Sequence, residues 1–196
     1  MAALIREMLA LDRALYSSAS EEDLGSFEYW SERFERCPDS LSLARQADGT
    51  LAGYYQFLPV TAEFRRQVVA GLAHDGQIPL EAILDYRSTS REHHLYLCSM
   101  AVRPEWHGRG VASRLYTEEV LFQRKLAQRG QRALSLLSVV WSPCGARFFD
   151  RIGSPCVGLD LAGRPIHERV LEDGCLPPLP ARRERLPVEA NTAQAT

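Results

Sequence analysis

The feature that most constrains this chain is a glycine-rich stretch, HGRGVA at residues 107–112. It follows a strand-like run that ends at residues 101–104 and precedes an amphipathic run that reaches Arg129. Glycines lack a Cβ atom, so their backbone can approach an anion closely, and the amides in the first turn of a helix have no acceptor within the helix. The stretch therefore predicts a phosphate-binding turn in which the amides of residues 108–113 face the anion.

Two familiar phosphate loops do not fit the spacing of this stretch. A Walker-type loop ends in Gly-Lys-Ser or Gly-Lys-Thr, whereas Gly110 is followed by Val111. A dinucleotide fingerprint would place a third glycine where Ser113 stands and an acidic residue about twenty residues further on, and the chain has neither.

Residues 97–115 instead resemble motif A of the GNAT superfamily of acyl-CoA N-acyltransferases, in which a strand and Val-x-Pro precede Arg/Gln-x-x-Gly-x-Gly/Ala and a helix. His107 stands where the family usually has Arg or Gln. Residues 142–153 (SPCGARFFDRIG) resemble its motif B, Asn-x-x-Ala-x-x-Phe-Tyr-x-x-x-Gly. The resemblance implies a GNAT fold, which is an α/β architecture with a mixed, mostly antiparallel central sheet flanked by helices.

Length and charge limit the class of protein. The chain has 196 residues and a formal net charge of -2, which suits one catalytic domain and disfavours nucleic acid or an anionic membrane as the main partner. No apolar run approaches the ~20 residues of a membrane span, so we expect a cytoplasmic protein. The five cysteines form no C-x-x-C pair, so neither disulfides nor a metal site is expected. Residues 1–175 are predicted to form the domain, and residues 176–196 a Pro- and Arg-containing tail.

Hydrophobic periodicity places the elements. The expected helices cover residues 3–16, 21–37 and 111–130, together with the motif B segment, and the expected strands cover residues 41–44, 51–58, 94–102, 133–141, 156–161 and 165–171. The family's first strand is not obvious before the helices. Residues 59–92 are too long for a plain connection, and Thr61 and Pro79 can begin helices through Ala73 and Tyr86. We therefore predict a helical insertion in residues 59–92. It would lie between the third and fourth strands if the family's first strand is counted as strand one.

The resemblance also implies acetyl-CoA as the cosubstrate and a division of roles along the chain. The glycine turn would hold the pyrophosphate, and the pantetheine arm would run beside residues 100–102, where the central strand splays from residues 139–141. An amide near Met100 or Ala101 would stabilise the oxyanion. The residues expected to bind the cosubstrate are Met100, Ala101, Val102, His107, Gly108, Arg109, Gly110, Val111, Ala112, Ser113 and Ser142.

Attack by an amine requires a base, because an alkyl ammonium has a pKa of about 10.4. Tyr96 and Cys98 stand where GNAT members commonly place Glu or His, and strand alternation puts both on one face with His94 and Met100. His94 is expected to supply the base, through water or through the Tyr96 hydroxyl. The catalytic residues are therefore expected to be Tyr96, His94 and Cys98; lesser candidates for the base are His93, Glu92 and Glu119.

Motif B has a second departure from the family, because Phe149 occupies the position of the tyrosine that protonates the leaving thiolate. Three alternatives follow. The thiolate leaves unassisted, a tyrosine from another strand (Tyr54, Tyr55 or Tyr96) replaces it, or the protein binds acyl-CoA without transferring the group. Ser142, which replaces the family's Asn, is also a simple helix cap candidate.

These observations predict an N-acetyltransferase that acts on a primary amine of a small molecule or peptide. The alternative is a non-catalytic acyl-CoA-binding or sensor module on the same fold, favoured by Phe149 and by the missing base on the strand. A toxin-type enzyme acting on aminoacyl-tRNA is disfavoured, since the chain is acidic and lacks a basic strip. Whether the protein forms a homodimer is left open.

Overall fold

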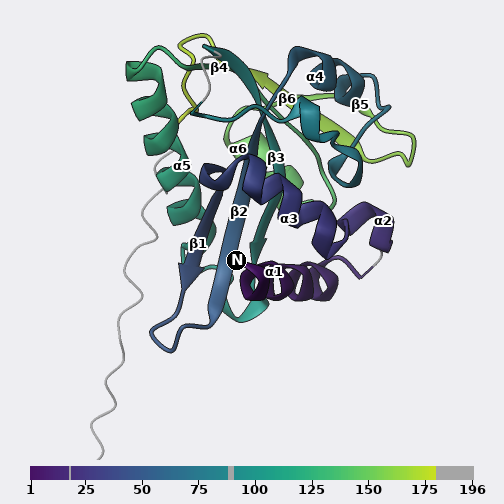
Figure 1. Ribbon diagram of the computed structural model, residues 1–196, viewed down its shortest axis with the longest axis vertical. Coiled ribbons are helices and arrows are strands. Elements are labelled where there is room, and N and C mark those ends of the chain that lie inside the picture. The colour runs from purple at the N-terminus through teal and green to yellow at the C-terminus, as the bar shows by residue number, and fades with distance from the viewer. Residues whose placement is uncertain (18, 88–90, 180–196) are drawn as a thin grey trace, which may run out of the picture.

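The fold is built on one six-stranded sheet with the order β1-β2-β3-β4-β6-β5 (Figure 1). The computed structural model describes residues 1–17, 19–87 and 91–179. Only the β3–β4 pair is parallel, and the other neighbours are antiparallel, so the predicted mixed, mostly antiparallel sheet is confirmed. The strands are β1 (Leu41–Arg45), β2 (Leu51–Val60), β3 (Glu92–Val102), β4 (Arg132–Val139), β5 (Cys156–Leu159) and β6 (Pro165–Val170).

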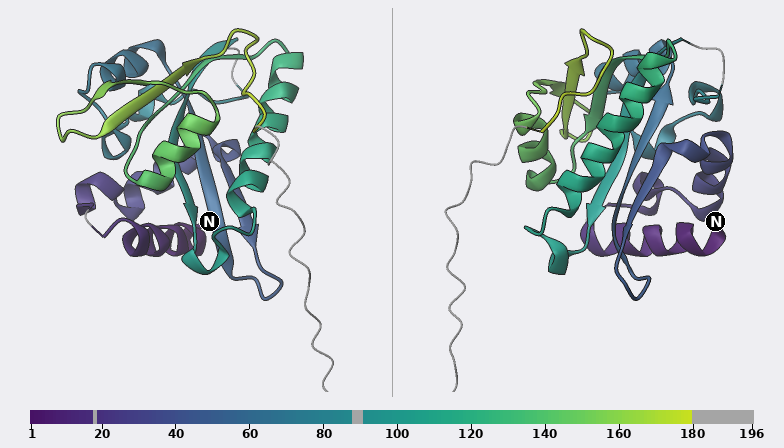
Figure 2. Two further views of the ribbon diagram at one scale, coloured as in Figure 1. Left: turned by 180° about the vertical axis from the view of Figure 1, so that it is seen from behind. Right: turned by 90° about the vertical axis from the view of Figure 1, so that its left-hand side faces the viewer.

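Helices cover both faces of the sheet (Figures 1 and 2). The front face carries α1 (Ala2–Leu15), α2 (Glu21–Leu24), α3 (Phe27–Arg36) and α4 (Ala62–Val69), and the back face carries α5 (Val111–Gln128) and α6 (Pro143–Arg151). Short 3-10 turns are η1 (Pro38–Ser40), η2 (Asp75–Gln77), η3 (Leu80–Ala82) and η4 (Pro104–Trp106). Because the sheet is covered twice, every residue of β2 is buried, and its sequence reads as an apolar run rather than an alternating one.

Local sequence explains where the first elements end. The helix predicted over residues 21–37 is broken into α2 and α3, because Gly25 has a φ of 75° and the Ser26 side chain then caps α3 by accepting a hydrogen bond from the Tyr29 amide. Gly49 has a φ of 87° in the turn between β1 and β2, as the Asp-Gly sequence predicts. Among the described residues, no strand precedes β1, so the family's first strand has no counterpart there.

The insertion lies between β2 and β3 and is less helical than predicted. α4 ends at Val69 rather than Ala73, since Gly71 takes a φ of 75°. The second predicted helix is reduced to the turn η3, because Ile83 leaves it to form a β-bridge with Val60. No helix in the described part of the chain is both long and apolar enough to cross a membrane.

The packed part of the chain extends slightly past the predicted domain boundary at residue 175. Leu176 is buried, and the Pro177 carbonyl accepts a hydrogen bond of 2.9 Å from the Tyr116 hydroxyl of α5. The remainder of the predicted tail, residues 180–196, lies outside the described residues.

Candidate active site

The glycine turn between β3 and α5 has the geometry of an anion cradle. Gly108 and Gly110 have φ values of 74° and 85°, and a Cβ atom built on either one would meet no atom within 4 Å. Gly110 is the N-cap of α5, and the first helical hydrogen bond runs from the Arg114 amide to the Gly110 carbonyl at 2.9 Å. The amides of residues 111–113 therefore have no acceptor within the helix and border open space. The turn thus fits the pyrophosphate of a nucleotide cosubstrate.

Two side chains of this turn contact the protein itself. His107 Nε2 lies 2.8 Å from the Val102 carbonyl oxygen, which ties the turn to the end of β3. The Arg109 guanidinium lies over the Trp106 ring, 4.9 Å from its centroid. Both side chains therefore shape the turn, while the backbone presents the amides.

β3 and β4 separate before β3 reaches the glycine turn. The last parallel pair is Tyr96 with Leu137, although β3 continues to Val102 and β4 to Val139. At the branch point the Ser138 hydroxyl donates a hydrogen bond of 2.8 Å to the Leu97 carbonyl, and beyond it β4 pairs only with β6. The hydrogen-bonded ladder between the ends of the two strands is therefore interrupted, at the place where the sequence predicted a splay, and this gap in the ladder is the opening between β3 and β4.

A β-bulge interrupts β3 at the edge of this opening. Gln56 of β2 lies opposite Ser99, whereas Phe57 lies opposite Leu97, so Cys98 is an extra residue on β3. An extra residue breaks the alternation of side chains and leaves part of the backbone outside the ladder. Backbone groups near the opening are thereby available to a ligand.

The bulge corrects the predicted alternation of side chains along β3. Tyr96 lies on the front face, where its ring packs edge-on against Phe64 of α4 with centroids 5.6 Å apart. Met100 lies opposite Tyr55, which faces Glu119 of α5 on the back. The prediction that Met100 shares a face with Tyr96 is therefore wrong, because the bulge shifts the alternation by one residue.

His94 and Cys98 do lie on the front side near Tyr96. His94 Nδ1 lies 2.8 Å from the Ser135 hydroxyl oxygen, and burial together with the nearby Arg65 cation lowers the pKa of the imidazole. Cys98 is buried, and burial together with the Asp75 carboxylate raises the pKa of its thiol. At neutral pH, neither side chain carries a charge.

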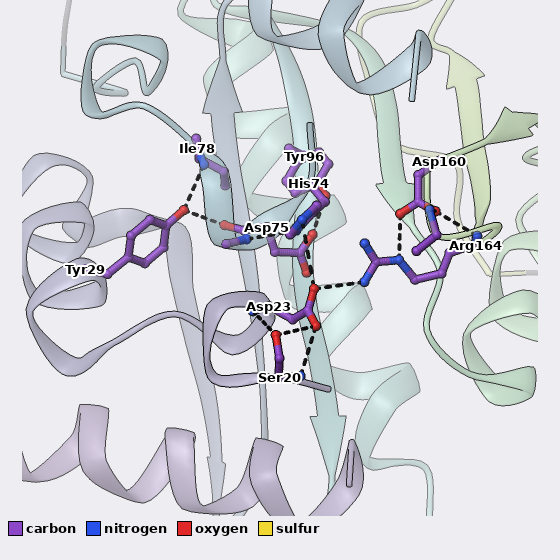
Figure 3. A network of polar contacts seen from close by, with 11 residues as sticks. Ser20, Asp23, Tyr29, His74, Asp75, Ile78, Tyr96, Asp160 and Arg164 are labelled. Carbon is purple, nitrogen blue, oxygen red and sulfur yellow. Dashed lines mark hydrogen bonds and ion pairs between the residues drawn. The ribbon is translucent and has the colours of Figure 1, made fainter. Parts of the chain in front are cut away.

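Asp75 is a functional candidate that the sequence analysis missed. It lies in η2 of the insertion, and the Tyr96 hydroxyl donates a hydrogen bond to its Oδ1 atom (Figure 3). Burial raises the pKa of this carboxyl to about 7, although the hydrogen bond from Tyr96 lowers it. No sequence motif marks Asp75, because its position depends on how the insertion folds back over β3.

A second carboxyl–tyrosine pair, Asp12 and Tyr54, lies on the same face under α1. The Tyr54 hydroxyl donates to Asp12 Oδ2, and burial raises the pKa of Asp12 to about 7. Asp12 Oδ1 and Gln56 Nε2 are buried without a hydrogen-bond partner among the described residues, and both residues line a small cavity with Ser99. Tyr16 lies nearby, since the charges of Asp12 and Asp75 both raise the pKa of its hydroxyl.

An ion-pair network lies on this front side of the sheet (Figure 3). Arg164, in the turn between β5 and β6, lies over the Trp141 ring at 3.7 Å from its centroid. Its guanidinium donates to Asp160 at 2.6 Å and to Asp23 at 3.3 Å. Asp23 belongs to α2, so the network joins the β5–β6 turn to the N-terminal helices.

Motif B packs on the back face. Ser142 is the N-cap of α6, and its hydroxyl oxygen accepts a hydrogen bond of 3.1 Å from the Gly145 amide, which is the capping role considered above. Phe149 is buried between Phe148 and His167, with ring centroids 5.3 Å and 5.2 Å away. Phe149 therefore places no hydroxyl at the position of the family's tyrosine.

Two lesser candidates for the base lie on the back face, away from the Asp75 side. Glu119 of α5 accepts a hydrogen bond of 2.6 Å from Gln123 and has a pKa raised to about 7 by burial. His93 is buried beside Tyr86, and burial lowers its pKa to about 4. In the described part of the chain, no group of three or more His, Cys, Asp or Glu side chains is arranged to hold a metal ion.

Comparison with known proteins agrees with this arrangement. The sequence model of the acetyltransferase (GNAT) family matches residues 5–140. No protein with curated annotation matches the chain.

Several solved structures share the fold at low sequence identity. The loading GNATL domain of CurA from Lyngbya majuscula is 15% identical, with 86% of this chain and 94% of that chain covered and a TM-score of 0.61. A GNAT-family acetyltransferase from Staphylococcus aureus Mu50 is 10% identical, with 86% and 91% covered and a TM-score of 0.53. The PaiA N-acetyltransferase of Thermoplasma acidophilum, solved in complex with coenzyme A, is 12% identical, with 87% and 94% covered and a TM-score of 0.52.

Proposed function

Because the chain belongs to the acetyltransferase (GNAT) family, we propose that it is an N-acetyltransferase that transfers the acetyl group of acetyl-CoA to a primary amine of a small molecule or peptide. The observation that carries the proposal is the open glycine turn placed directly beside the splayed ends of β3 and β4. The turn fits a pyrophosphate, and Tyr96 of the front face lies at the point where the pairing of the two strands ends. A relative of the same fold was solved with coenzyme A, which supports the choice of cosubstrate.

Each part of the site has a proposed role in the reaction. The Arg109 amide donates to the Trp106 carbonyl, so the amides of residues 110–113 hold the pyrophosphate, with residues 100–102, His107, Gly108, Arg109 and Ser142 around the cosubstrate. Acetyl-CoA supplies the acetyl thioester. An amide at Met100 or Ala101, next to the bulge, stabilises the oxyanion, which is commonly the largest electrostatic contribution to such catalysis. Tyr96, His94 and Cys98 lie on the acceptor side, where the amine loses its proton.

The leaving thiolate needs no tyrosine in this scheme. Two of the three tyrosines considered from sequence, Tyr54 and Tyr96, donate their hydroxyl hydrogens to Asp12 and Asp75. A thiol pKa of about 8.5 makes the thiolate a tolerable leaving group near neutral pH. We therefore propose that it departs unassisted and is protonated by solvent.

A cytoplasmic location belongs to the same proposal. A homodimer formed through β5 belongs to the proposal too, because the apolar side chains of Val157 and Leu159 are exposed on this edge strand of the sheet. Neither statement is needed for the chemistry described above.

The proposed site is tested by placing a negative charge in the phosphate cradle. Gly110→Glu is expected to abolish the rise in melting temperature that acetyl-CoA gives the wild-type protein, because the carboxylate occupies the phosphate position. Gly130→Glu is the matched control: Gly130 lies just past the other end of α5, has a φ of 81° and has no atom within 4 Å of its Cβ position. It should melt at a temperature similar to Gly110→Glu yet keep the full response to acetyl-CoA.

Catalysis is then measured as release of free thiol from acetyl-CoA with a panel of primary amines. Turnover by the wild-type protein and the Gly130→Glu control, with none by Gly110→Glu, is the expected result. An equal acetyl-CoA response in both glycine variants would refute the cradle. Binding of acetyl-CoA with no thiol release for any amine would favour the non-catalytic sensor instead.

A further inference from the structure

We propose that Asp75, carried by the segment between β2 and β3, takes up the proton of the acceptor amine by way of the Tyr96 hydroxyl. The inference rests on the proposed function and adds to it the general base, which β3 itself does not supply. Tyr96 is then the catalytic residue that meets the amine. Asp75 is the positioning residue that orients the Tyr96 hydroxyl and accepts its proton.

Tyr96 lies where the pairing of β3 with β4 ends. Tyr96 forms the last parallel pair with β4, and the extra residue Cys98 follows two positions later. Its hydroxyl is on the front face and donates to Asp75 Oδ1, and both side chains are buried (Figure 3). A hydroxyl that already points to a carboxylate therefore lies where the pairing of β3 with β4 ends.

The segment that carries Asp75 is held firmly in place. The Tyr29 hydroxyl of α3 donates to the Asp75 carbonyl and accepts from the Ile78 amide at 2.9 Å. Gly76 lies so close to α2 that a Cβ atom on it would be 2.0 Å from the Glu22 carbonyl oxygen. These contacts fix the backbone of the turn that carries the carboxyl.

The charges that surround Asp75 come from several elements. Asp12 of α1 adds a negative charge that raises the pKa of Asp75, and Arg164 of the β5–β6 turn lowers it. Further titratable groups that face this carboxyl or adjoin it are Tyr16, Tyr29, His74, Tyr96 and Cys98. With a pKa of about 7, Asp75 is ionised in about half of the molecules at neutral pH, which suits a general base.

The proposed step conserves atoms and charge. The acceptor enters as an ammonium, and one of its N–H protons passes to Tyr96 Oη while the Tyr96 O–H proton passes to Asp75 Oδ1. The neutral amine nitrogen then forms a bond to the acetyl carbonyl carbon. Collapse of the tetrahedral intermediate breaks the C–S bond and releases the thiolate, and the nitrogen gives its second proton to solvent. Asp75 later returns its proton to solvent through Tyr96, and the thiolate takes a proton from solvent.

The test compares the pH dependence of kcat/KM for wild-type protein and for Asp75→Asn. For the wild type, kcat/KM should rise about tenfold per pH unit below pH 7 and level off above it, since only ionised Asp75 accepts the proton. Asp75→Asn should lose about 10²- to 10⁴-fold at pH 8 and should lose the inflection near pH 7. Tyr96→Phe should lose a similar factor, and the double variant should be little worse than either single one.

The control is Glu119→Gln, which removes a buried carboxyl of similar pKa on the opposite face of the sheet. It should keep both the rate and the inflection. A second variant avoids changes to the pair itself: Asp12→Asn removes a charge that raises the pKa of Asp75, so it should move the inflection to lower pH without removing it. A merely structural role for Asp75 would not produce such a shift.

The outcomes separate this inference from the proposed function. If the wild type binds acetyl-CoA but acetylates no amine, the enzymatic function fails and the relay fails with it. If the wild type is active and Asp75→Asn, folded as shown by circular dichroism, keeps the inflection and most of the rate, the relay alone is refuted. If Asp75→Asn does not fold, the Asp12→Asn shift and the Tyr96→Phe loss decide the matter.

Discussion

At the scale of single residues, the main feature of the site is the pairing of tyrosine hydroxyls with buried aspartate carboxyls. The front face holds two tyrosine–aspartate pairs, one bringing Tyr54 to Asp12 and the other Tyr96 to Asp75. Each carboxyl is buried and shifted to a pKa of about 7. His94, the base expected from sequence, contacts Ser135 instead, at 2.8 Å. The structure thus offers the Tyr96 hydroxyl a closer acceptor than His94.

The two acceptors are distinguished by comparing His94→Ala with Tyr96→Phe. If the relay runs through Asp75, His94→Ala should change kcat by less than about threefold, because its imidazole contacts a serine rather than the Tyr96 hydroxyl. Tyr96→Phe should then be slower by about 10²-fold or more. Initial rates of thiol release at pH 8 measure both. Equal, large losses in the two variants would restore His94 as the terminus of the relay.

At the scale of elements, the segment between β2 and β3 is part of the core as well as the carrier of Asp75. Its side chains Phe64, Val68, Ile78 and Ile83 are almost fully buried. Val60 of β2 forms a β-bridge with Ile83, so the segment extends the sheet locally. Removing the whole segment would expose this apolar surface to water, so its catalytic part is better tested by a local displacement.

Gly76→Ala supplies that displacement. The added Cβ atom cannot fit 2.0 Å from the Glu22 carbonyl oxygen, so the turn must move and carry Asp75 away from Tyr96. We expect kcat to fall at least tenfold while the Kd for acetyl-CoA, measured by calorimetry, stays within about twofold. Gly158→Ala on β5 is the control, because the nearest atom to its Cβ position is 3.8 Å away. A parallel loss of acetyl-CoA affinity in Gly76→Ala would show that the turn supports the whole fold.

At the scale of the whole molecule, three buried carboxyls make stability depend on pH. Asp12, Asp75 and Glu119 each have a pKa raised to about 7, and burial is the largest cause in each case. A raised pKa in the folded state means that the folded protein holds the proton more tightly than the unfolded chain. Their contribution to stability is therefore fully present below about pH 4 and is lost as the pH rises through 7.

This linkage predicts that the protein becomes less stable between pH 5 and pH 8. Glu119→Gln should lessen the decline, because it removes a carboxyl whose pKa rises from 4.5 to about 7 on folding. A shift of this size corresponds to roughly 3 kcal/mol at pH 8, as an upper bound, and to almost nothing at pH 4. Urea unfolding of the wild type and of Glu119→Gln, at pH 4 and at pH 8, measures the difference in their free energies of unfolding. A difference that does not change with pH would contradict the linkage.

The sequence by itself determined most of the elements and the glycine turn that is proposed to hold the cosubstrate. The glycine turn at residues 107–112, the helix after it and the order of the strands follow from local rules: positive φ angles favour glycine, and buried strands and amphipathic helices have distinct periods. Such properties depend on neighbours in the chain, so one sequence suffices to predict them. The splay of β3 from β4 also followed, through the family resemblance.

Only the tertiary structure decided which side chains meet on the front face. The bulge at Cys98 depends on the register between β2 and β3, and it reversed the predicted orientation of Met100. Asp75 is 21 residues from Tyr96 in sequence, and their contact exists because the insertion folds back between α2, α3 and the sheet. The raised pKa of Asp75 arises from burial by segments distant in the chain. Burial and long-range contacts arise only when the whole chain packs together, so no local pattern in the sequence predicts them.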